Sequence, residues 1–306
     1  MPLPRVLPDK TRFDFMGKRW IGFTVSIILT LVSIALVCTE GLNLGIDFTG
    51  GILMEIHTDK PLELARVRDT LSHQGFGEVS LQNLGSERDV LIRLQVSKDE
   101  EQAKIVDELK GVLNTQTGQT IDYRKIDYVG PTMGSELVEN GILAVISAFS
   151  AIMVYLWYRF EWQYGVGAVV SLLHNSIMLF GFFAFTRFEF GATAIAAILT
   201  VVGYSVNDTV VIYDRIRENM RRYKKMDVSE LLNVSINDTL SRTILTVTTV
   251  LLAAMSLAIF GGEVIRGLSC AIVFGVVVGT YSSIYIASPM LIYLHIRPKL
   301  ETKPIG

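Results

Sequence analysis

The sequence predicts an all-α membrane bundle of six helices with a small α+β domain inserted after the first span. Half of the 306 residues are hydrophobic and only 19% are charged. The mean hydropathy of +0.41 lies outside the range of soluble domains of this length. Six stretches are long and apolar enough to cross a hydrocarbon core of about 30 Å. One soluble-like segment, 39 to 135, separates the first stretch from the second.

The six spans are expected near residues 20 to 38, 137 to 158, 163 to 186, 191 to 213, 241 to 260 and 267 to 294. The first follows a basic tail, 1 to 19, as a cleavable signal would. Its apolar stretch is too long for a signal core, and Val37 before Cys38 is not the small residue of a lipoprotein site. We interpret it as an uncleaved anchor. Cys38 and Cys270 lie in or at the ends of spans, so free, buried thiols are expected and not a disulfide.

Basic residues gather in three regions that lie on one side of six spans. They occupy the N-terminal tail, the loop after the fourth span and the C-terminal tail, 297 to 306: Arg5, Lys10, Arg12, Lys18, Arg19, Arg215, Arg217, Arg221, Arg222, Lys224, Lys225, Arg297, Lys299 and Lys303. The opposite short loops hold only Arg187 and Arg266. Because short cytoplasmic loops retain Lys and Arg, both termini are predicted to be cytoplasmic and 39 to 135 to be periplasmic.

The periplasmic segment is predicted to be ferredoxin-like, with the order βαββαβ. Strands are expected at 51 to 57, 78 to 84, 89 to 96 and 120 to 129, and helices at 61 to 74 and 99 to 113. Pro61 suits the first turn of a helix, and residues 85 to 88 suit a turn between strands. No nucleophile, metal cluster or phosphate loop stands out in this domain. Binding or force transmission is therefore expected of it, and for the whole chain no enzyme activity, metal or cofactor.

A glycine-rich turn follows the first span. Gly45, Gly50 and Gly51 suit tight backbone turns, and Asp47 among them is expected to cap or stabilise that turn, not to bind a ligand. Within the spans, small residues four apart indicate close helix packing and a compact bundle. Such pairs are Gly275 with Gly279, Ala144 with Ala148, and Ala192 with Ala196.

Asp208 is the single carboxylate in the apolar run of the fourth span. A carboxylate near the middle of a membrane helix costs roughly 2.5 to 3.5 kcal/mol, so it marks a site for protons, ions or substrate. Arg242 on the fifth span enters from the same side, at a shallower expected depth. Burial would favour the protonated form of Asp208 and a nearby guanidinium the charged form, so a motion that separates the two would load and release a proton. The alternatives are an ion pair that only pins two helices, or an Arg242 that reaches back to the interface.

Other polar residues of the spans have secondary expected roles. Asn207, Ser205 and Thr209 could solvate a path beside Asp208. His174 and Asn175, midway along the third span, form a possible secondary polar site, and we expect His174 to be hydrogen-bonded to a neighbouring helix.

Four motifs resemble the SecF family of the resistance-nodulation-division superfamily. They are GIDFTGG at 45–51, VGPTMGSEL at 129–137, VGYSVNDTVVIYDRIREN at 202–219 and SRT at 241–243. The resemblance runs nearly end to end and implies that the bundle is one six-helix permease half. It implies a subunit in the bacterial inner membrane that pairs with SecD and uses the proton-motive force for protein export after the SecA step. In this family Asp208 and Arg242 stand where residues are tied to proton passage, whereas Asn175 stands where an aspartate is common.

The resemblance also implies a set of partners. They are SecD in a heterodimer, the SecYEG translocon with SecA and YajC-like subunits, the translocating preprotein, protons and membrane lipid, with no nucleic acid.

Two functions of other classes compete with this interpretation. Ser205 and His295 together resemble the nucleophile and base of an intramembrane serine protease, but His295 lies at the cytoplasmic end and Ser205 more than two turns deeper. A stand-alone proton-coupled exporter of small molecules would use the same bundle. Such chains usually contain two six-helix halves, whereas this sequence has one and no internal repeat, so it is expected to need a partner half.

Overall fold

The computed structural model describes residues 11–74, 79–94 and 102–296, which form two compact units. One unit holds the α+β domain, defined here as β1 to β4. The other unit holds most of the helix bundle. Six helical segments are long and apolar enough to cross a membrane: Arg19–Thr39, Met133–Arg159, Trp162–Thr186, Ala192–Arg222, Val228–Phe260 and Ile265–Tyr293.

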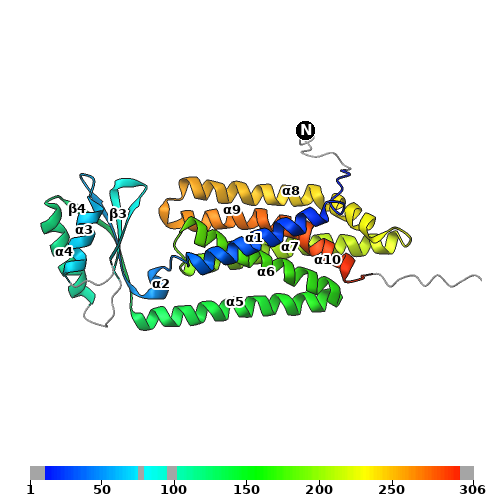
Figure 1. Ribbon diagram of the computed structural model, residues 1–306, viewed down its shortest axis with the longest axis horizontal. Coiled ribbons are helices and arrows are strands. Elements are labelled where there is room, and N and C mark those ends of the chain that lie inside the picture. The colour runs from blue at the N-terminus through cyan, green and yellow to red at the C-terminus, as the bar shows by residue number, and fades with distance from the viewer. Residues whose placement is uncertain (1–10, 75–78, 95–101, 297–306) are drawn as a thin grey trace, which may run out of the picture. The chain divides into compact units, whose positions relative to one another are not determined.

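The α+β domain is a four-stranded antiparallel sheet with the strand order β2-β3-β1-β4. Its elements are β1 (Gly51–Thr58), α3 (Leu64–His73), β2 (Val79–Leu84), β3 (Ser86–Leu94), α4 (Gln102–Thr117) and β4 (Ile121–Val129). A one-turn helix, α2 (Ile46–Thr49), precedes β1. Helices α3 and α4 cover one face of the sheet (Figure 1). Alternation along β1 places Ile52, Met54 and Ile56 in the core beneath them, each fully buried.

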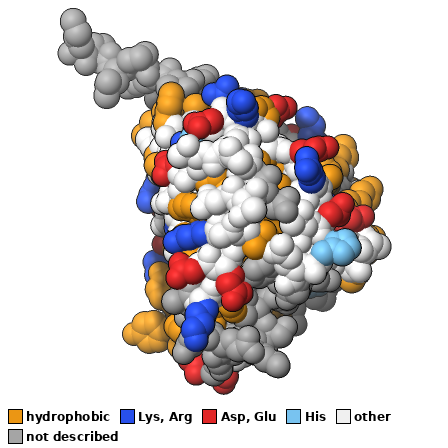
Figure 2. All heavy atoms as spheres, turned by 90° about the vertical axis from the view of Figure 1, so that its left-hand side faces the viewer, with side chains coloured by type: hydrophobic (Ala, Val, Ile, Leu, Met, Phe, Trp, Pro, Cys, Tyr) orange, Lys and Arg blue, Asp and Glu red, His pale blue; other side chains and the backbone are white. Residues whose placement is uncertain are grey.

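The visible face of this domain carries mixed charge. Acidic and basic side chains are interspersed over it, and neither sign forms a large patch (Figure 2). Asp89 on β3 accepts hydrogen bonds from Ser86 and His57 and pairs with Arg124 at 2.8 Å. These hydrogen bonds, led by that of Ser86, hold the pKa of Asp89 below its usual value.

The boundaries of this domain differ from the sequence prediction at several points. Pro61 lies outside the helix, which begins at Leu64, because the segment before it is held by Lys60 N–H on the side chain of Gln119. The strand expected at 89 begins at Ser86, since the chain turns at Gly85 alone, with φ +69°. Helix α4 runs on to Thr117, four residues further than predicted. The expected ends at 78, 95–96 and 99–101 fall outside the described residues.

The bundle consists of α1 (Arg19–Thr39), α5 (Pro131–Arg159), α6 (Trp162–Thr186), α7 (Ala192–Arg222), α8 (Val228–Phe260), α9 (Glu263–Ser282), a π-helical turn (Ser283–Ala287) and α10 (Ser288–Tyr293). Helices α1, α6, α8 and α9 run alongside one another (Figure 1). Helix α1 approaches α6 closely, because a Cβ on Gly181 would lie 2.4 Å from the side chain of Ser33. Phe182 of α6 stacks on Phe274 of α9, with ring centres 4.8 Å apart.

Two bundle helices extend well beyond the apolar spans. Helix α7 continues to Arg222 and α8 begins at Val228, so the basic residues expected in a loop lie mostly on α7. Before α1, residues 11–18 lie against α8, where Asn237 exchanges two hydrogen bonds with the backbone of Phe13. The cysteines are free, but neither is buried as expected: Cys38 is exposed and Cys270 is half-buried.

Candidate functional site

The carboxylate of Asp208 lies in the interior of the bundle, near the middle of α7. It is 6% exposed and stands about four helical turns from the C-terminal end of α7 at Arg222. The hydroxyl of Thr243 on α8 donates a hydrogen bond of 2.9 Å to its Oδ1. Its Oδ2 is buried without a hydrogen-bond partner in the described part of the chain. One carboxylate oxygen of Asp208 therefore accepts a hydrogen bond, from a neutral hydroxyl, and the other accepts none within the described residues.

Arg242 does not form an ion pair with Asp208 among the described residues, and it is exposed on α8. Its expected shallower depth stays a prediction: Arg242 comes one residue before Thr243, which contacts Asp208, so it lies about 1.5 Å nearer the start of α8. Because α8 begins as far back as Val228, Arg242 stands about four turns from the helix end, as Asp208 does. Successive residues of a helix point about 100° apart. Since Thr243 faces Asp208, its neighbour Arg242 points to the side.

A hydrogen bond between α6 and α7 lies near Asp208. The side-chain amide of Asn175 donates to Ser205 Oγ at 2.7 Å, and both residues are 1% exposed. His174 is also buried, but its Nδ1 lies 3.4 Å from the side chain of Asn175, its neighbour on the same helix. Its Nε2 has no partner within the described residues. The inter-helix bond expected of His174 is thus made by Asn175.

Helix α9 packs closely against α7 at the glycines that the sequence pattern indicated. A Cβ on Gly279 would lie 3.1 Å from the Cβ of Ser205, and one on Gly275 would lie 2.4 Å from Val201. One turn further, Thr209 and Ser283 share a hydrogen bond of 2.8 Å at the π-helical turn. Buried polar groups from α6, α7, α8 and the π-helical turn therefore form one layer through the bundle, which includes Asp208.

Several polar residues of the spans lie outside this layer. Asn207 is exposed on α7, so it does not line the interior beside Asp208 as expected. Ala192, Ala196 and Ala144 are also exposed, and the close packing expected at these alanines is not found in the described bundle. The exposed polar or small residues of α7 and α8 recur at helical spacing: Thr200, Gly203, Asn207, Arg242, Thr249 and Ser256. We call this set the polar stripe.

Asp47 has a role that sequence reasoning missed. Its Oδ2 accepts a hydrogen bond of 2.8 Å from the backbone N–H of Ala192, the first residue of α7. It therefore caps the helix that carries Asp208, and not its own turn. The carboxylate approaches so closely that a Cβ on Gly191 would lie 2.6 Å from it.

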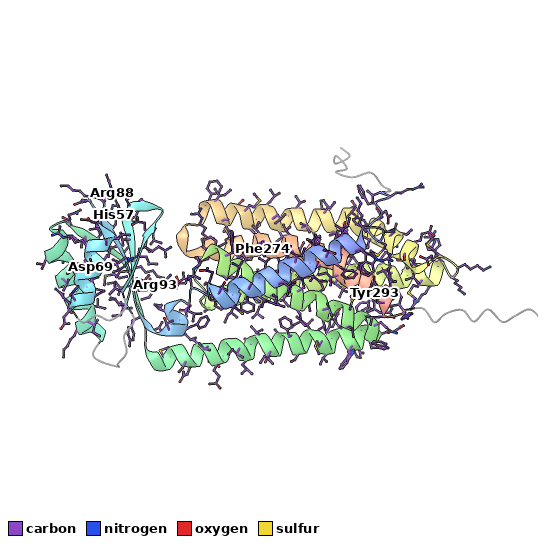
Figure 3. All side chains as sticks on the ribbon, viewed as in Figure 1. His57, Asp69, Arg88, Arg93, Phe274 and Tyr293 are labelled. Atoms are coloured by element: carbon purple, nitrogen blue, oxygen red, sulfur yellow. The ribbon has the colours of Figure 1, made fainter. Side chains whose placement is uncertain are left out.

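The glycine-rich turn and the residues before α7 are held together by further contacts. Gly50 and Gly51 have φ of +69° and +128°, so the tight turn expected of them is confirmed. Gly45 has an ordinary φ of −77°. Arg93, on the sheet face opposite α3 (Figure 3), pairs with Glu189 just before α7. Burial raises the pKa of Glu189, and the charge of Arg93 opposes that rise.

The arrangement of a nucleophile and a base is not found. Ser205 is bonded to Asn175, and His295 lies after the end of α10 with φ +51°. Within the described ranges no group of three His, Cys, Asp or Glu side chains is placed to hold a metal ion. The protease alternative has no support from this geometry.

Fold and site together define a multi-pass membrane protein with a buried carboxylate in its helix bundle and an inserted α+β domain. The family model for the C-terminal region of the protein export membrane proteins SecD and SecF matches residues 110–297, and the SecD/SecF GG motif matches 36–62. The chain belongs to the SecF family of protein translocase subunits of the Sec pathway.

Individual relatives cover most of the chain. It is 49% identical over 287 residues to protein translocase subunit SecF of Rickettsia akari and of Rickettsia conorii, which covers 94% of this chain and 93% of each relative. The crystal structure of SecDF from Thermus thermophilus, a translocon-associated membrane protein, matches with a TM-score of 0.85 and 33% identity. A SecDF structure in a super-membrane-facing form matches with a TM-score of 0.70 and 33% identity. The matches cover 95% and 96% of this chain but 40% of each SecDF chain.

Proposed function

We propose that this chain is a proton-driven subunit of the protein-export machinery, in which Asp208 takes up and releases the proton. Membership in a family of translocase subunits supports the export role. The observation that carries the proton role is the incomplete satisfaction of a buried carboxylate. Asp208 has one oxygen bonded to the hydroxyl of Thr243 and the other without a partner in the described chain. A buried carboxylate without a counter-ion is stable when it carries a proton, and such residues in membrane spans mark proton relays.

In this proposal Arg242 stabilises the second protonation state of Asp208, the charged carboxylate. It is the neighbour of Thr243 on α8, so a rotation of α8 by about 100° would replace the hydroxyl beside Asp208 by the guanidinium. The guanidinium would favour the charged form of Asp208 and so release the proton. One charge that crosses 100 mV of membrane potential supplies about 2.3 kcal/mol. A few protons per cycle would supply enough free energy for a domain motion.

The proposal includes a SecD-type partner with its own helix bundle. The polar stripe supports it, because polar side chains and a charged Arg242 on an exposed face at membrane depth are unfavourable against lipid and suited to another helix bundle. The SecDF structures, of which this chain matches 40%, also support such a pairing. We extend the proposal to the SecYEG translocon with SecA and YajC-like subunits on the strength of family membership.

The proposed membrane is the bacterial inner membrane, with both chain ends on the cytoplasmic side and the α+β domain in the periplasm. The basic side chains on the last turns of α7 support this orientation. We also assign the α+β domain to the ferredoxin-like class. The order β1-α3-β2-β3-α4-β4 along the chain and β2-β3-β1-β4 across the sheet support that assignment.

Asp208→Asn tests the proton role while keeping the size of the side chain. In inverted membrane vesicles that contain the SecD-type partner, the variant should export a preprotein at the rate seen without a proton-motive force. Glu230→Gln is the matched control, because it removes an exposed carboxylate from α8 and should export as the unaltered protein does. Full stimulation of export by the proton-motive force in Asp208→Asn would rule out the proton role.

Co-purification separates this function from that of a stand-alone exporter. Both the unaltered protein and Asp208→Asn should purify with the SecD-type subunit from native membranes. Proton-coupled activity of this chain reconstituted without that subunit would favour the exporter instead.

A further inference from the structure

A basic pocket lies at the C-terminal end of α7. It is lined by Arg159, the last residue of α5, and by five residues of α7: Asp214, Arg217, Glu218, Arg221 and Arg222. Four guanidinium groups therefore face two carboxylates. Glu218 is also paired with Arg215, outside the lining, at 2.7 Å. The pocket has an excess of positive charge and is suited to an anion.

Two of the arginines are held in place by the protein. The guanidinium carbons of Arg159 and Arg217 lie 5.0 and 5.6 Å from the ring centre of Phe160, which is itself buried. Arg159 donates two hydrogen bonds, of 2.8 and 2.9 Å, to the carboxylate of Asp214. Arg217 donates to the backbone carbonyl of Arg159 at 3.3 Å. These contacts fix the two side chains before any ligand binds, which lowers the entropic cost of binding.

The remaining two arginines keep their charge available, although the guanidinium carbon of Arg222 lies 5.3 Å from the ring centre of Tyr223. Arg221 and Arg222 are exposed on the last turn of α7, and the described part of the chain gives neither an ion pair. A planar guanidinium that is not already paired recognises phosphate oxygens well. The pocket thus combines two arginines that are held by Phe160 with two that have no ion pair in the described chain and are available to a phosphate group.

The surrounding residues place the pocket at the level of the lipid headgroups. Trp157, Tyr158 and Trp162 adjoin Arg159 in the sequence and are 65%, 92% and 56% exposed. Exposed tryptophan and tyrosine beside an apolar span are typical of the membrane–water interface. An anion at this depth that is available in quantity is the phosphodiester of an anionic phospholipid.

We propose that Arg159, Arg217, Arg221 and Arg222 form a binding site for the headgroup of an anionic phospholipid. The ligand class is the phosphodiester, and its source is the bilayer, not a soluble phosphate. The site is separate from the layer that contains Asp208, so it does not depend on the proton proposal.

Native mass spectrometry of the full chain in detergent tests the site, because it resolves the number of lipid molecules bound to each protein and a charge-matched control variant separates site binding from nonspecific attraction. Phosphatidylglycerol would be titrated against the unaltered protein, Arg217→Gln/Arg221→Gln and the control Lys224→Gln/Lys225→Gln. The control removes the same charge from exposed residues beyond the pocket. We expect the arginine variant to bind phosphatidylglycerol about fivefold more weakly for each charge removed. The lysine control should bind as the unaltered protein does.

The other results would overturn the proposal in distinct ways. Equal weakening in the two double variants would mean nonspecific attraction to basic residues. Equal binding of zwitterionic phosphatidylcholine would mean that the phosphodiester charge is not recognised. Displacement of phosphatidylglycerol by millimolar inorganic phosphate would assign the pocket to a soluble anion.

Discussion

The cap that Asp47 places on α7 can be tested by removing the carboxylate. Asp47→Ala leaves the N–H of Ala192, now bonded at 2.8 Å, without its acceptor. Loss of a side-chain N-cap costs about 1 kcal/mol. For amides that exchange through local opening of the first turn, this corresponds to exchange about fivefold faster. Asp47→Asn keeps an acceptor oxygen and loses only the attraction of a charge to the helix end, about 0.3 to 1 kcal/mol, so its effect should be smaller.

The assay is hydrogen exchange measured by mass spectrometry on peptides that cover residues 186–195, with the full chain in lipid nanodiscs. The control Asp59→Ala removes an exposed carboxylate directly after β1 and should leave these peptides unchanged. Unaltered exchange in Asp47→Ala would refute the reasoning, because the hydrogen bond would then contribute nothing to the start of α7. Equal effects of Asp47→Ala and Asp47→Asn would refute the part that rests on the hydrogen bond, and unaltered exchange in Asp47→Asn would refute the part that rests on charge.

Two further predictions concern packing and pH. Gly181→Ala places a Cβ 2.4 Å from the side chain of Ser33 and should destabilise the bundle by about 1 to 3 kcal/mol, seen as a lower thermal unfolding midpoint in detergent. Gly111→Ala, with open space around it, should not lower that midpoint, and equal midpoints for the two variants would contradict the close approach. The lowered pKa of Asp89 means that its contribution to stability is complete above the unfolded pKa of about 3.9 and is lost as pH falls through the folded value. Strand β3 should therefore exchange faster in Asp89→Asn than in the unaltered protein at pH 7, and the gap should close in acid; a gap independent of pH would count against this linkage.

The site residues that could be predicted from the sequence are those whose role follows from local composition alone. Asp208 could be found because a carboxylate in an apolar run is unfavourable wherever the helix packs. Its partner Thr243 could not, because the choice between Thr243 and Arg242 depends on the rotation of α8 about its axis. The contact between Asp47 and Ala192 joins residues far apart in the chain, and no local pattern encodes it.

The fold could be predicted where periodicity dominates and not where tertiary contacts do. The alternation of Ile52, Met54 and Ile56 indicated a strand with one buried face, as observed. The helix start predicted from Pro61 is wrong, because hydrogen bonds from Lys60 to Gln119, after α4, and from Leu62 to Glu87 of β3 hold this segment outside the helix. Hydropathy could not show that α7 and α8 continue past the membrane, since polar helical turns carry no apolar signal.

The most direct test of the central claim is infrared difference spectroscopy of the reconstituted complex as a proton-motive force is imposed and then removed. Protonation of Asp208 should give a carboxylic C=O band that appears and disappears with the proton-motive force, persists in Glu230→Gln and is absent in Asp208→Asn. The same band in Asp208→Asn, or no band in the unaltered complex, would contradict the claim that Asp208 carries the proton.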